Sequence, residues 1–190
     1  MFRSDLIPGY DKAVDYLASC VTSIPDYPKP GILFRDITSL CQDARAFGLA
    51  VDLLTQVFAC VHVDKIVSAE SRGYLFGAPL AARLNCGFVM VRKPGKLPRE
   101  VLEEHYELEY GTNTLQVHKD AIKQGERILV VDDLLATGGT VEAMIKLIQR
   151  AGGICMGAGF LLELFDLGGA ARIARAHGVE CFSLIKFPGH

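Results

Sequence analysis

One stretch decides the fold: Arg127-Ile-Leu-Val-Val-Asp-Asp-Leu-Leu-Ala-Thr-Gly-Gly-Thr140. Its apolar run, residues 128–131, is rich in β-branched side chains and predicts a strand buried on both faces of a parallel sheet. A turn of small residues follows, and then a helical pattern over residues 141–151. A strand, a glycine turn and a helix in this order indicate an α/β domain with ligands at the carboxyl ends of its strands.

The turn over residues 136–140 has the composition of a phosphate-binding site. Its two glycines can adopt positive φ and leave backbone N–H groups unobstructed. Two threonine hydroxyls and the positive end of the following helix add to this anion site. Asp132 and Asp133 precede the turn and suit sugar hydroxyls or a hydrated Mg²⁺. The loop therefore predicts a ligand with a phosphate on one side and a diol or metal on the other, as in a phosphorylated ribose.

Composition narrows the class of protein. The chain has 190 residues, half of them hydrophobic, which suits one domain with a substantial core. A net charge of −2 gives no electrostatic reason to expect nucleic acid or an anionic membrane as partner. The sequence contains no apolar run of about 20 residues and no signal peptide, so we expect a cytoplasmic protein. Its six cysteines form no C-x-x-C pair and predict reduced, mostly buried thiols.

Residues 127–140 resemble the binding motif for phosphoribosyl pyrophosphate (PRPP) in type I phosphoribosyltransferases. Among these, Val-Val-Asp-Asp-Leu-Leu-Ala-Thr-Gly-Gly-Thr is most similar to the adenine phosphoribosyltransferases. The resemblance runs from about Ser23 to Ile185. It implies one domain over residues 1–190, with a mostly parallel central sheet flanked by helices. It also implies an N-terminal helix and hood over about 1–40 and a flexible catalytic loop over about 92–113.

The same resemblance implies a reaction and its partners. PRPP and adenine would give AMP and pyrophosphate in purine salvage, by transfer of the 5-phosphoribosyl group to N9 of adenine. Mg²⁺ would be the cofactor, held mainly by the substrate and not by direct side-chain ligation, and the chain would form a homodimer. The residues implied to bind PRPP are Ser71, Arg72, Arg92, Lys93, Lys96, Tyr110, Asp132, Asp133, Ala136, Thr137, Gly138, Gly139 and Thr140.

The segment before Thr38 has two interpretations. Three prolines and a glycine exclude regular structure over residues 24–31. From the residues alone, Phe34 is a core aromatic beside a surface pair of Arg35 and Asp36. The segment also resembles the hood that recognises adenine. This resemblance implies backbone contacts from Leu33 and Arg35 to the adenine edge, with Phe34 packed on the ring.

Two further loops follow predicted strands. Glu70-Ser71-Arg72-Gly73 lies between a strand over 65–69 and a helix over 75–84, and it resembles the pyrophosphate loop of the family, in which the peptide before the serine is often cis. Residues 92–99 are basic and rich in glycine and proline. From composition they are a solvated loop, but they also have the chemistry of a lid that brings cations to a polyphosphate.

The acidic residues 100–109 are expected to face solvent, except where the motif Leu-Glu-Tyr-Gly assigns a role. There the resemblance singles out Glu109 as general acid or base, with Arg72 as the second catalytic residue, and Tyr110 as a PRPP contact. Residues 187–190 are expected to form a frayed tail. Gly168-Gly169 stands where the family usually has Gly-Arg, and we expect this departure to touch no residue of the site.

Further strands are expected over residues 87–91, 114–118, 154–162 and 181–185, and further helices over 11–21, 43–61 and 170–176.

Two alternative functions remain open. A type I phosphoribosyltransferase could use another base, although the Phe34 segment and Leu-Glu-Tyr-Gly favour adenine. A regulatory module could bind PRPP without reacting, but it would need neither the basic loop nor Glu109. A Rossmann enzyme is excluded because Gly-x-Gly-x-x-Gly follows no strand in the sequence.

Overall fold

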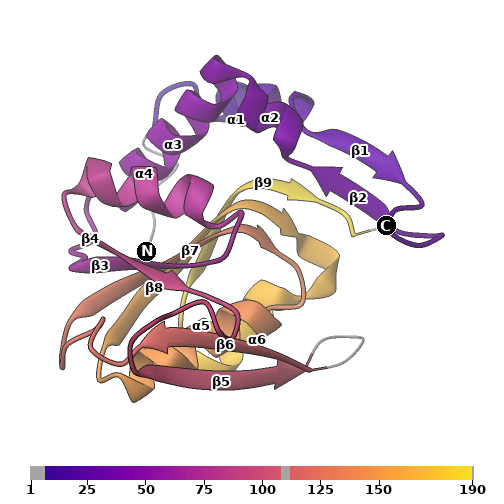
Figure 1. The fold of residues 1–190 in the computed structure, drawn as a ribbon. Coiled ribbons are helices and arrows are strands. Elements are labelled where there is room, and N and C mark those ends of the chain that lie inside the picture. Colours follow the sequence, from indigo (N-terminus) through magenta and orange to yellow (C-terminus); the bar gives the residue numbers. More distant parts are fainter. Residues whose placement is uncertain (1–6, 108–111, 190) are drawn as a thin grey trace.

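The computed structural model describes residues 7–107 and 112–189, which form three layers with a parallel sheet in the middle (Figure 1). The sheet has five strands in the order β4 (Gly87–Val91), β3 (Lys65–Ala69), β7 (Arg127–Leu135), β8 (Ile154–Leu164) and β9 (Cys181–Phe187). Every neighbouring pair is parallel. The predicted fold class, a mostly parallel sheet flanked by helices, is therefore confirmed.

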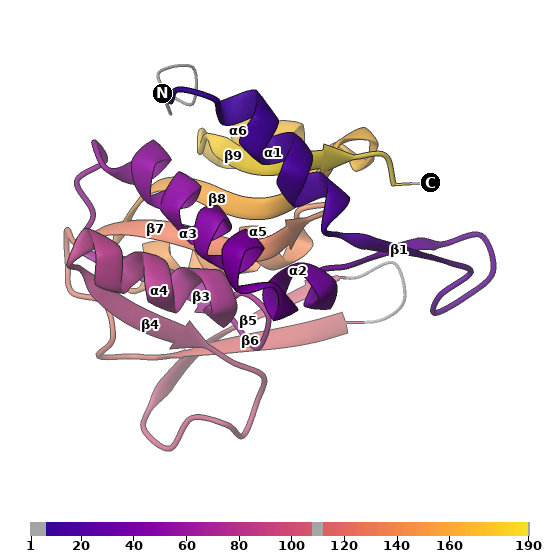
Figure 2. The ribbon, with the colours of Figure 1, turned by 90° about the horizontal axis from the view of Figure 1, so that it is seen from above.

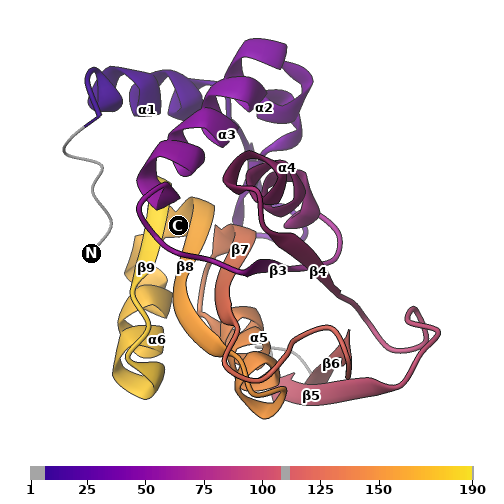
Figure 3. The ribbon, with the colours of Figure 1, turned by 90° about the vertical axis from the view of Figure 1, so that its left-hand side faces the viewer.

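Helices cover both faces of the sheet, as the predicted alternation of strands and helices requires. On one face lie α1 (Tyr10–Ser19), α2 (Thr38–Gln42), α3 (Ala44–Phe58) and α4 (Tyr74–Leu84), which Figure 2 shows from above. On the other face lie α5 (Gly139–Arg150) and α6 (Gly169–His177), with the short 3₁₀ helix η2 (Phe165–Leu167) before α6 (Figure 3). The largest of these, α3, begins where the Asp43 side chain accepts a hydrogen bond of 2.8 Å from the Ala46 amide, a typical N-cap.

Strand β7 is buried on both faces because its side chains alternate between two cores. Ile128 and Val130 point into the core under α5 and α6. Leu129 and Val131 point into the core under α1 to α4. All four are fully buried. This explains why the strand reads as an unbroken apolar run instead of an alternating one.

Two antiparallel hairpins extend from the sheet. One pairs β1 (Thr22–Pro25) with β2 (Leu33–Asp36); it lies in the segment that the resemblance assigns to the hood, and we use that name for it below. The expectation of no regular structure from residue 24 was therefore wrong for Ile24 and Pro25, which end β1, and the turn begins only at Asp26. Pro25 is tolerated because it is the last residue of a strand in a two-stranded sheet, where one edge needs no donor.

The second hairpin pairs β5 (Val101–Glu107) with β6 (Thr112–His118). The strand over 114–118 was predicted, but 101–107 was expected to belong to a flexible loop. Instead, alternate side chains of β5 give it an inner face. Leu102 and Tyr106 pack against the core on the α5 side, and Glu104 between them pairs with α5.

Residues 187–189 are held and not frayed, contrary to expectation, while residue 190 lies outside the described residues. Phe187 ends β9, and the guanidinium of Arg35 lies 4.4 Å from the centre of its ring. Arg35 also donates a hydrogen bond to the carbonyl of Pro188, and the Gly189 amide donates one of 2.7 Å to Asp166. The tail therefore links β2 to the short helix η2 that follows β8.

All six cysteines are free thiols; five are half-buried and Cys60 is exposed. The prediction of mostly buried thiols was thus too strong. Within residues 7–107 and 112–189, no helix is long and apolar enough to cross a membrane.

Replacing Gly159 by Ala should destabilise the fold. Gly159 lies in β8 against the buried ring of Phe58, and a Cβ there would come within 2.6 Å of two ring atoms. Such overpacking costs about 1–3 kcal/mol in free energy of unfolding, measurable by urea denaturation. Gly48 in α3 is the matched control, because a Cβ there meets nothing within 4 Å. Gly48→Ala should gain about 0.5–1 kcal/mol. Equal losses in both variants would contradict this account of the core.

Candidate active site

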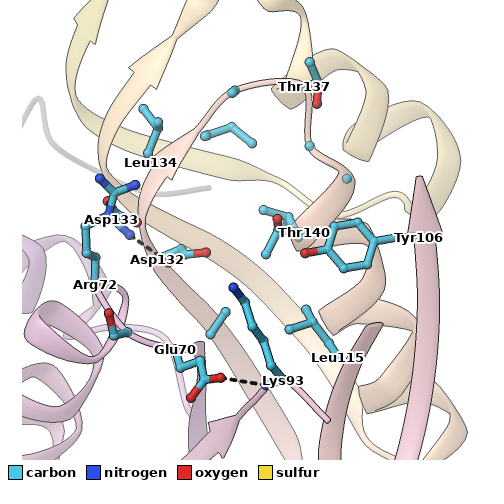
Figure 4. A pocket seen from close by; sticks show the side chains of 17 residues that line it. Glu70, Arg72, Lys93, Tyr106, Leu115, Asp132, Asp133, Leu134, Thr137 and Thr140 are labelled. Carbon is cyan, nitrogen blue, oxygen red and sulfur yellow. Dashed lines mark hydrogen bonds and ion pairs between the residues drawn. The ribbon is translucent and has the colours of Figure 1, made fainter. Parts of the chain in front are cut away.

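A cavity of about 440 Å³ opens where β3, β4 and β7 end (Figure 4). Its wall combines the segments that follow these three strands, as the sequence predicted for the carboxyl edge of a parallel sheet. Residues 69–72 come from the end of β3, Lys93 follows β4, and residues 132–141 come from β7 and the start of α5. Ten of the predicted PRPP-binding residues line this one cavity: Ser71, Arg72, Lys93, Asp132, Asp133, Ala136, Thr137, Gly138, Gly139 and Thr140.

The turn between β7 and α5 has the form of an anion site. Gly138 adopts φ 88°, a left-handed conformation that favours glycine, and α5 begins at the next residue. Within the described part of the chain, no acceptor takes a hydrogen bond from the amides of residues 137–141. The positive end of a 12-residue helix and several uncommitted donors therefore face the cavity.

The same turn rests on the start of α6, which the sequence analysis did not foresee. A Cβ on Gly169 would clash with the carbonyl oxygen of Ala136, and a Cβ on Gly138 would lie 3.3 Å from the carbonyl oxygen of Gly169. The expectation that Gly168-Gly169 touches no residue of the site was therefore wrong. Only a residue without a side chain fits between α6 and the turn, so this glycine sets how closely the two segments approach.

Both aspartates lie within strand β7, which continues to Leu135 and does not end at residue 131 as expected. The strand is longer because β8 runs beside it, with Asp132 paired to Phe160 and Leu135 paired to Glu163. Asp132 Oδ1 accepts a hydrogen bond of 3.0 Å from the Asp133 amide. Asp133 Oδ2 lies 2.8 Å from Arg72 Nε, so the carboxylates and the β3 loop meet across the cavity.

The two carboxyl groups are held in an environment that opposes their ionisation. Burial raises the pKa of Asp132 well above its ordinary value, and the neighbouring Asp133 raises it further. Burial also raises the pKa of Asp133, although the guanidinium of Arg72 offsets part of the effect. A cationic ligand placed here would favour the ionised forms. The site is therefore suited to bind positive charge, whether a metal ion or a cationic sugar ring.

The loop after β3 organises the basic segment that follows β4. Glu70 accepts hydrogen bonds of 2.7 Å from Arg92 Nε and 2.9 Å from the Lys93 amide. Burial opposes ionisation of Glu70, but these two hydrogen bonds together lower its pKa. The peptide bond between Glu70 and Ser71 is cis, as the resemblance implied. Lys93 thus reaches the cavity, whereas Arg92 is bound to Glu70 and, like Lys96, does not line it.

The hood residues approach the cavity but do not line it. The Phe34 ring is in edge contact with Tyr27, with ring centres 5.1 Å apart, and its centre lies 5.9 Å from the Arg72 guanidinium. The side chain of Arg35 turns away to Ser23 and Phe187. Leu33 precedes them on β2 and is half-buried. Glu109 and Tyr110 lie outside the described residues.

Several residues of the wall were missed by the sequence analysis. Tyr106 and Leu115 come from the β5–β6 hairpin, Glu70 from the β3 loop, and Leu134, Leu135 and Val141 flank the phosphate turn. Tyr106 could have been found from the alternation of Leu102, Glu104 and Tyr106, which puts all three on one face of a strand. The many glutamates around it suggested a solvated stretch instead.

The donor set is compatible with a metal ion carried largely by a substrate. Among the described residues, no three His, Cys, Asp or Glu side chains gather into a site that could hold a metal. Asp132 and Asp133 supply carboxylate oxygens from one side only. Mg²⁺ commonly takes one or two carboxylates from a protein and its other ligands from substrate phosphates and water.

Comparisons with known proteins agree with this geometry. Residues 45–188 match the model of the phosphoribosyl transferase domain. The chain is 56% identical over 177 residues to the adenine phosphoribosyltransferase of Klebsiella pneumoniae (strain 342), covering 93% of this chain and 96% of that protein. It has the same identity and coverage with the enzyme of Escherichia coli O157:H7.

Solved structures give the same result. The crystal structure of adenine phosphoribosyltransferase from Thermoanaerobacter pseudethanolicus has a TM-score of 0.87 and 49% identity, covering 92% of this chain and 99% of that one. The enzyme from Saccharomyces cerevisiae, in complex with an imino-altritol bisphosphate and adenine, has a TM-score of 0.84 and 35% identity, with coverage of 92% and 99%. This chain belongs to the type I phosphoribosyltransferase family and, within it, to the adenine phosphoribosyltransferases.

Proposed function

We infer that this protein transfers the 5-phosphoribosyl group from PRPP to N9 of adenine, giving AMP and pyrophosphate in purine salvage. It is an enzyme, a pentosyltransferase. The observation that carries this conclusion is the joint wall of one cavity. A phosphate-binding turn, two buried carboxylates and the cations Arg72 and Lys93 surround a space of about 440 Å³ in a chain 56% identical to adenine phosphoribosyltransferases.

The transfer displaces pyrophosphate from C1 of the ribose while positive charge develops on the sugar ring. The protein must hold two reactants in line and stabilise the departing anion. In our proposal, residues 136–140 hold the 5-phosphate, and Asp132 and Asp133 hold ribose hydroxyls and favour the cationic ring. Ser71, Arg72 and Lys93 bind the pyrophosphate. The ionisation that burial opposes in the free enzyme would thus be favoured as charge develops on the substrate.

Mg²⁺ bound to the substrate would neutralise charge on the pyrophosphate. The residues nearest to it would be Asp132 and Asp133, with most of its ligands supplied by PRPP and water. Arg92 and Lys96 would add positive charge beside the pyrophosphate. Arg92 donates a hydrogen bond to Glu70 in the loop after β3. This contact supports a position of the Arg92 guanidinium close to the departing pyrophosphate.

The adenine ring would lie between the hood and the cavity. Leu33 and Arg35 would contact its edge through their backbones, and Phe34 would pack on its face. The position of Phe34, 5.9 Å from Arg72 of the cavity wall, supports this placement. Tyr110 would contact PRPP. We further propose a cytoplasmic homodimer, for which exposed Leu75 and Met90 offer apolar contact surface.

Adenine and PRPP should give AMP with release of pyrophosphate, and the rate should fall sharply when Mg²⁺ is chelated. Hypoxanthine and guanine, tested at the same concentrations, should react far more slowly. Product formation can be followed by chromatography of the nucleotides. A preference for another base would reassign the substrate, and tight PRPP binding without release of pyrophosphate from any purine would instead indicate a regulatory module.

Glu109→Gln should lower turnover far more than it lowers PRPP affinity. We propose that Glu109 exchanges a proton with the purine as N9 reacts, a role typically worth 10²–10⁴ in rate. Steady-state kinetics and PRPP binding by calorimetry separate the two effects. Glu107→Gln, two residues earlier in the sequence, is the matched control. Equal losses of turnover and affinity in Glu109→Gln would make its role structural.

Asp132→Asn should stabilise the free protein while weakening its binding of PRPP. The pKa of Asp132 in the folded state lies above its ordinary value of 3.8, so ionisation opposes folding above that pH. Asn removes this opposition, so the Tm near pH 8 should rise; in a domain of this size each kcal/mol corresponds to roughly 2–4 °C. The gain should shrink as the pH falls toward 3.8.

Asp64→Asn is a control for this prediction, because it should change the stability in the opposite direction. Hydrogen bonds from Arg127 lower the pKa of Asp64 to about 2. Its carboxylate therefore stabilises the fold above its ordinary pKa, and this contribution is lost as the pH falls toward 2. Asp64→Asn should lower the Tm near pH 8. Identical Tm values for wild type and Asp132→Asn at that pH would contradict the assignment of a destabilising carboxylate.

A further inference from the structure

The β5–β6 hairpin supplies one wall of the cavity, opposite the loop after β3. Tyr106 of β5 and Leu115 of β6 both line it. Figure 4 shows the Tyr106 ring reaching across the cavity with its hydroxyl directed toward Thr140, at the start of α5. A phenol thus faces the turn that carries the uncommitted amides, from a segment 30 residues away in the sequence.

The inner face of β5 is docked on the same helix that the phosphate turn begins. Glu104 lies two residues before Tyr106 on this face. Its carboxylate is 3.0 Å from Arg150 Nη1 and 3.7 Å from Lys146 Nζ, both on α5, and its side chain is only 18% exposed. Arg150 also donates a hydrogen bond to the backbone carbonyl of Glu103. Arg150 and Lys146 are 50% and 40% exposed, so each pair alone contributes little, but the two pairs and the Arg150 hydrogen bond together hold this part of β5 on α5.

These contacts continue from α5 to α6. Lys146, which Glu104 binds, also lies 3.2 Å from Glu142. Glu142 in turn lies 2.6 Å from Arg172 of α6, the helix whose first residue, Gly169, packs against Ala136 of the phosphate turn. A series of ion pairs along α5 therefore connects the hairpin to α6, whose first residue packs on the phosphate turn.

A phosphate dianion has three oxygens that accept several hydrogen bonds. The turn offers its amides and two threonine hydroxyls from one side, which leaves the outward side of a bound phosphate without protein donors from α5. A tyrosine O–H is a donor on a rigid ring, and the ring itself covers the site from water. From its position, Tyr106 can both donate a hydrogen bond to a ligand bound on the turn and shield that ligand from water.

We propose that Tyr106 binds the 5-phosphate of the substrate from the hairpin side, and that Glu104 positions it by docking β5 on α5. This inference rests on the proposed function, because it takes the turn over residues 136–140 as the 5-phosphate site. Tyr106 touches the substrate, whereas Glu104 acts through Tyr106. The hairpin thereby contributes to recognition of the sugar phosphate.

Tyr106→Phe tests the first part, with ribose 5-phosphate and inorganic pyrophosphate as separate probes in calorimetry. Loss of a hydrogen bond to a charged group should weaken ribose 5-phosphate binding about tenfold. Pyrophosphate affinity should stay within about twofold of wild type, which also shows that the site is intact. The KM for PRPP should rise with little change in kcat, because the 5-phosphate contact is the same in ground state and transition state.

Glu104→Gln tests the second part through its dependence on Tyr106. Alone, it should weaken ribose 5-phosphate binding about threefold, and it should have no further effect in the Tyr106→Phe background, since interacting groups are not additive. Glu103→Gln is the matched control. Glu103 lies on the outer face of the same strand, where its carboxylate binds Gln116 and lies 3.7 Å from His105. It should leave both probes unaffected.

The outcomes separate this inference from the proposed function. Unchanged ribose 5-phosphate affinity in Tyr106→Phe, with binding by the wild type, overturns the role of Tyr106 and leaves the proposed function standing. Parallel losses for both probes also overturn it, because they would make Tyr106 structural. Additive effects of Glu104→Gln and Tyr106→Phe overturn the positioning role of Glu104. A wild-type protein that binds neither ribose 5-phosphate nor PRPP would instead refute the proposed function.

Discussion

Two carboxyl groups buried beside the positive end of a helix are the constraint on which this structure depends. Asp132 and Asp133 are each less than 10% exposed, and burial raises the pKa of both. The fold holds them there because β7 is fixed on both faces by apolar side chains and on both edges by parallel neighbours. The strand can therefore keep two carboxyl groups together near its end.

In the free protein, ionisation of these two carboxyl groups is therefore electrostatically unfavourable. Arg72 relieves part of this effect through its 2.8 Å contact with Asp133, and a cationic substrate state would relieve the rest. The same region contains Gly138, whose left-handed conformation places the turn amides at the start of α5. Catalytic sites commonly hold charged groups in such environments, since groups preorganised for a transition state are not at their own optimum.

The sequence was sufficient to locate the strands of the parallel sheet, because the apolar runs and turns that mark each strand are local signals. The apolar run at 128–131 and the glycine turn after it located β7, although not its full length, together with α5 and most of the cavity wall. The features that the sequence did not predict depend on contacts between distant segments. The clash that a side chain on Gly169 would make with Ala136, and the reach of Tyr106 toward Thr140, follow from how α6 and the hairpin dock on α5. The tail was misread for the same reason, since Arg35 and Asp166 hold it from elsewhere in the chain.

The most direct test of the central claim is a crystal structure of the protein with PRPP and Mg²⁺ in the absence of adenine. The account predicts that the 5-phosphate lies on the amides of residues 137–140 and that the ribose hydroxyls lie within hydrogen-bond distance of Asp132 or Asp133. A 5-phosphate bound elsewhere, or a ribose turned away from both aspartates, would contradict it.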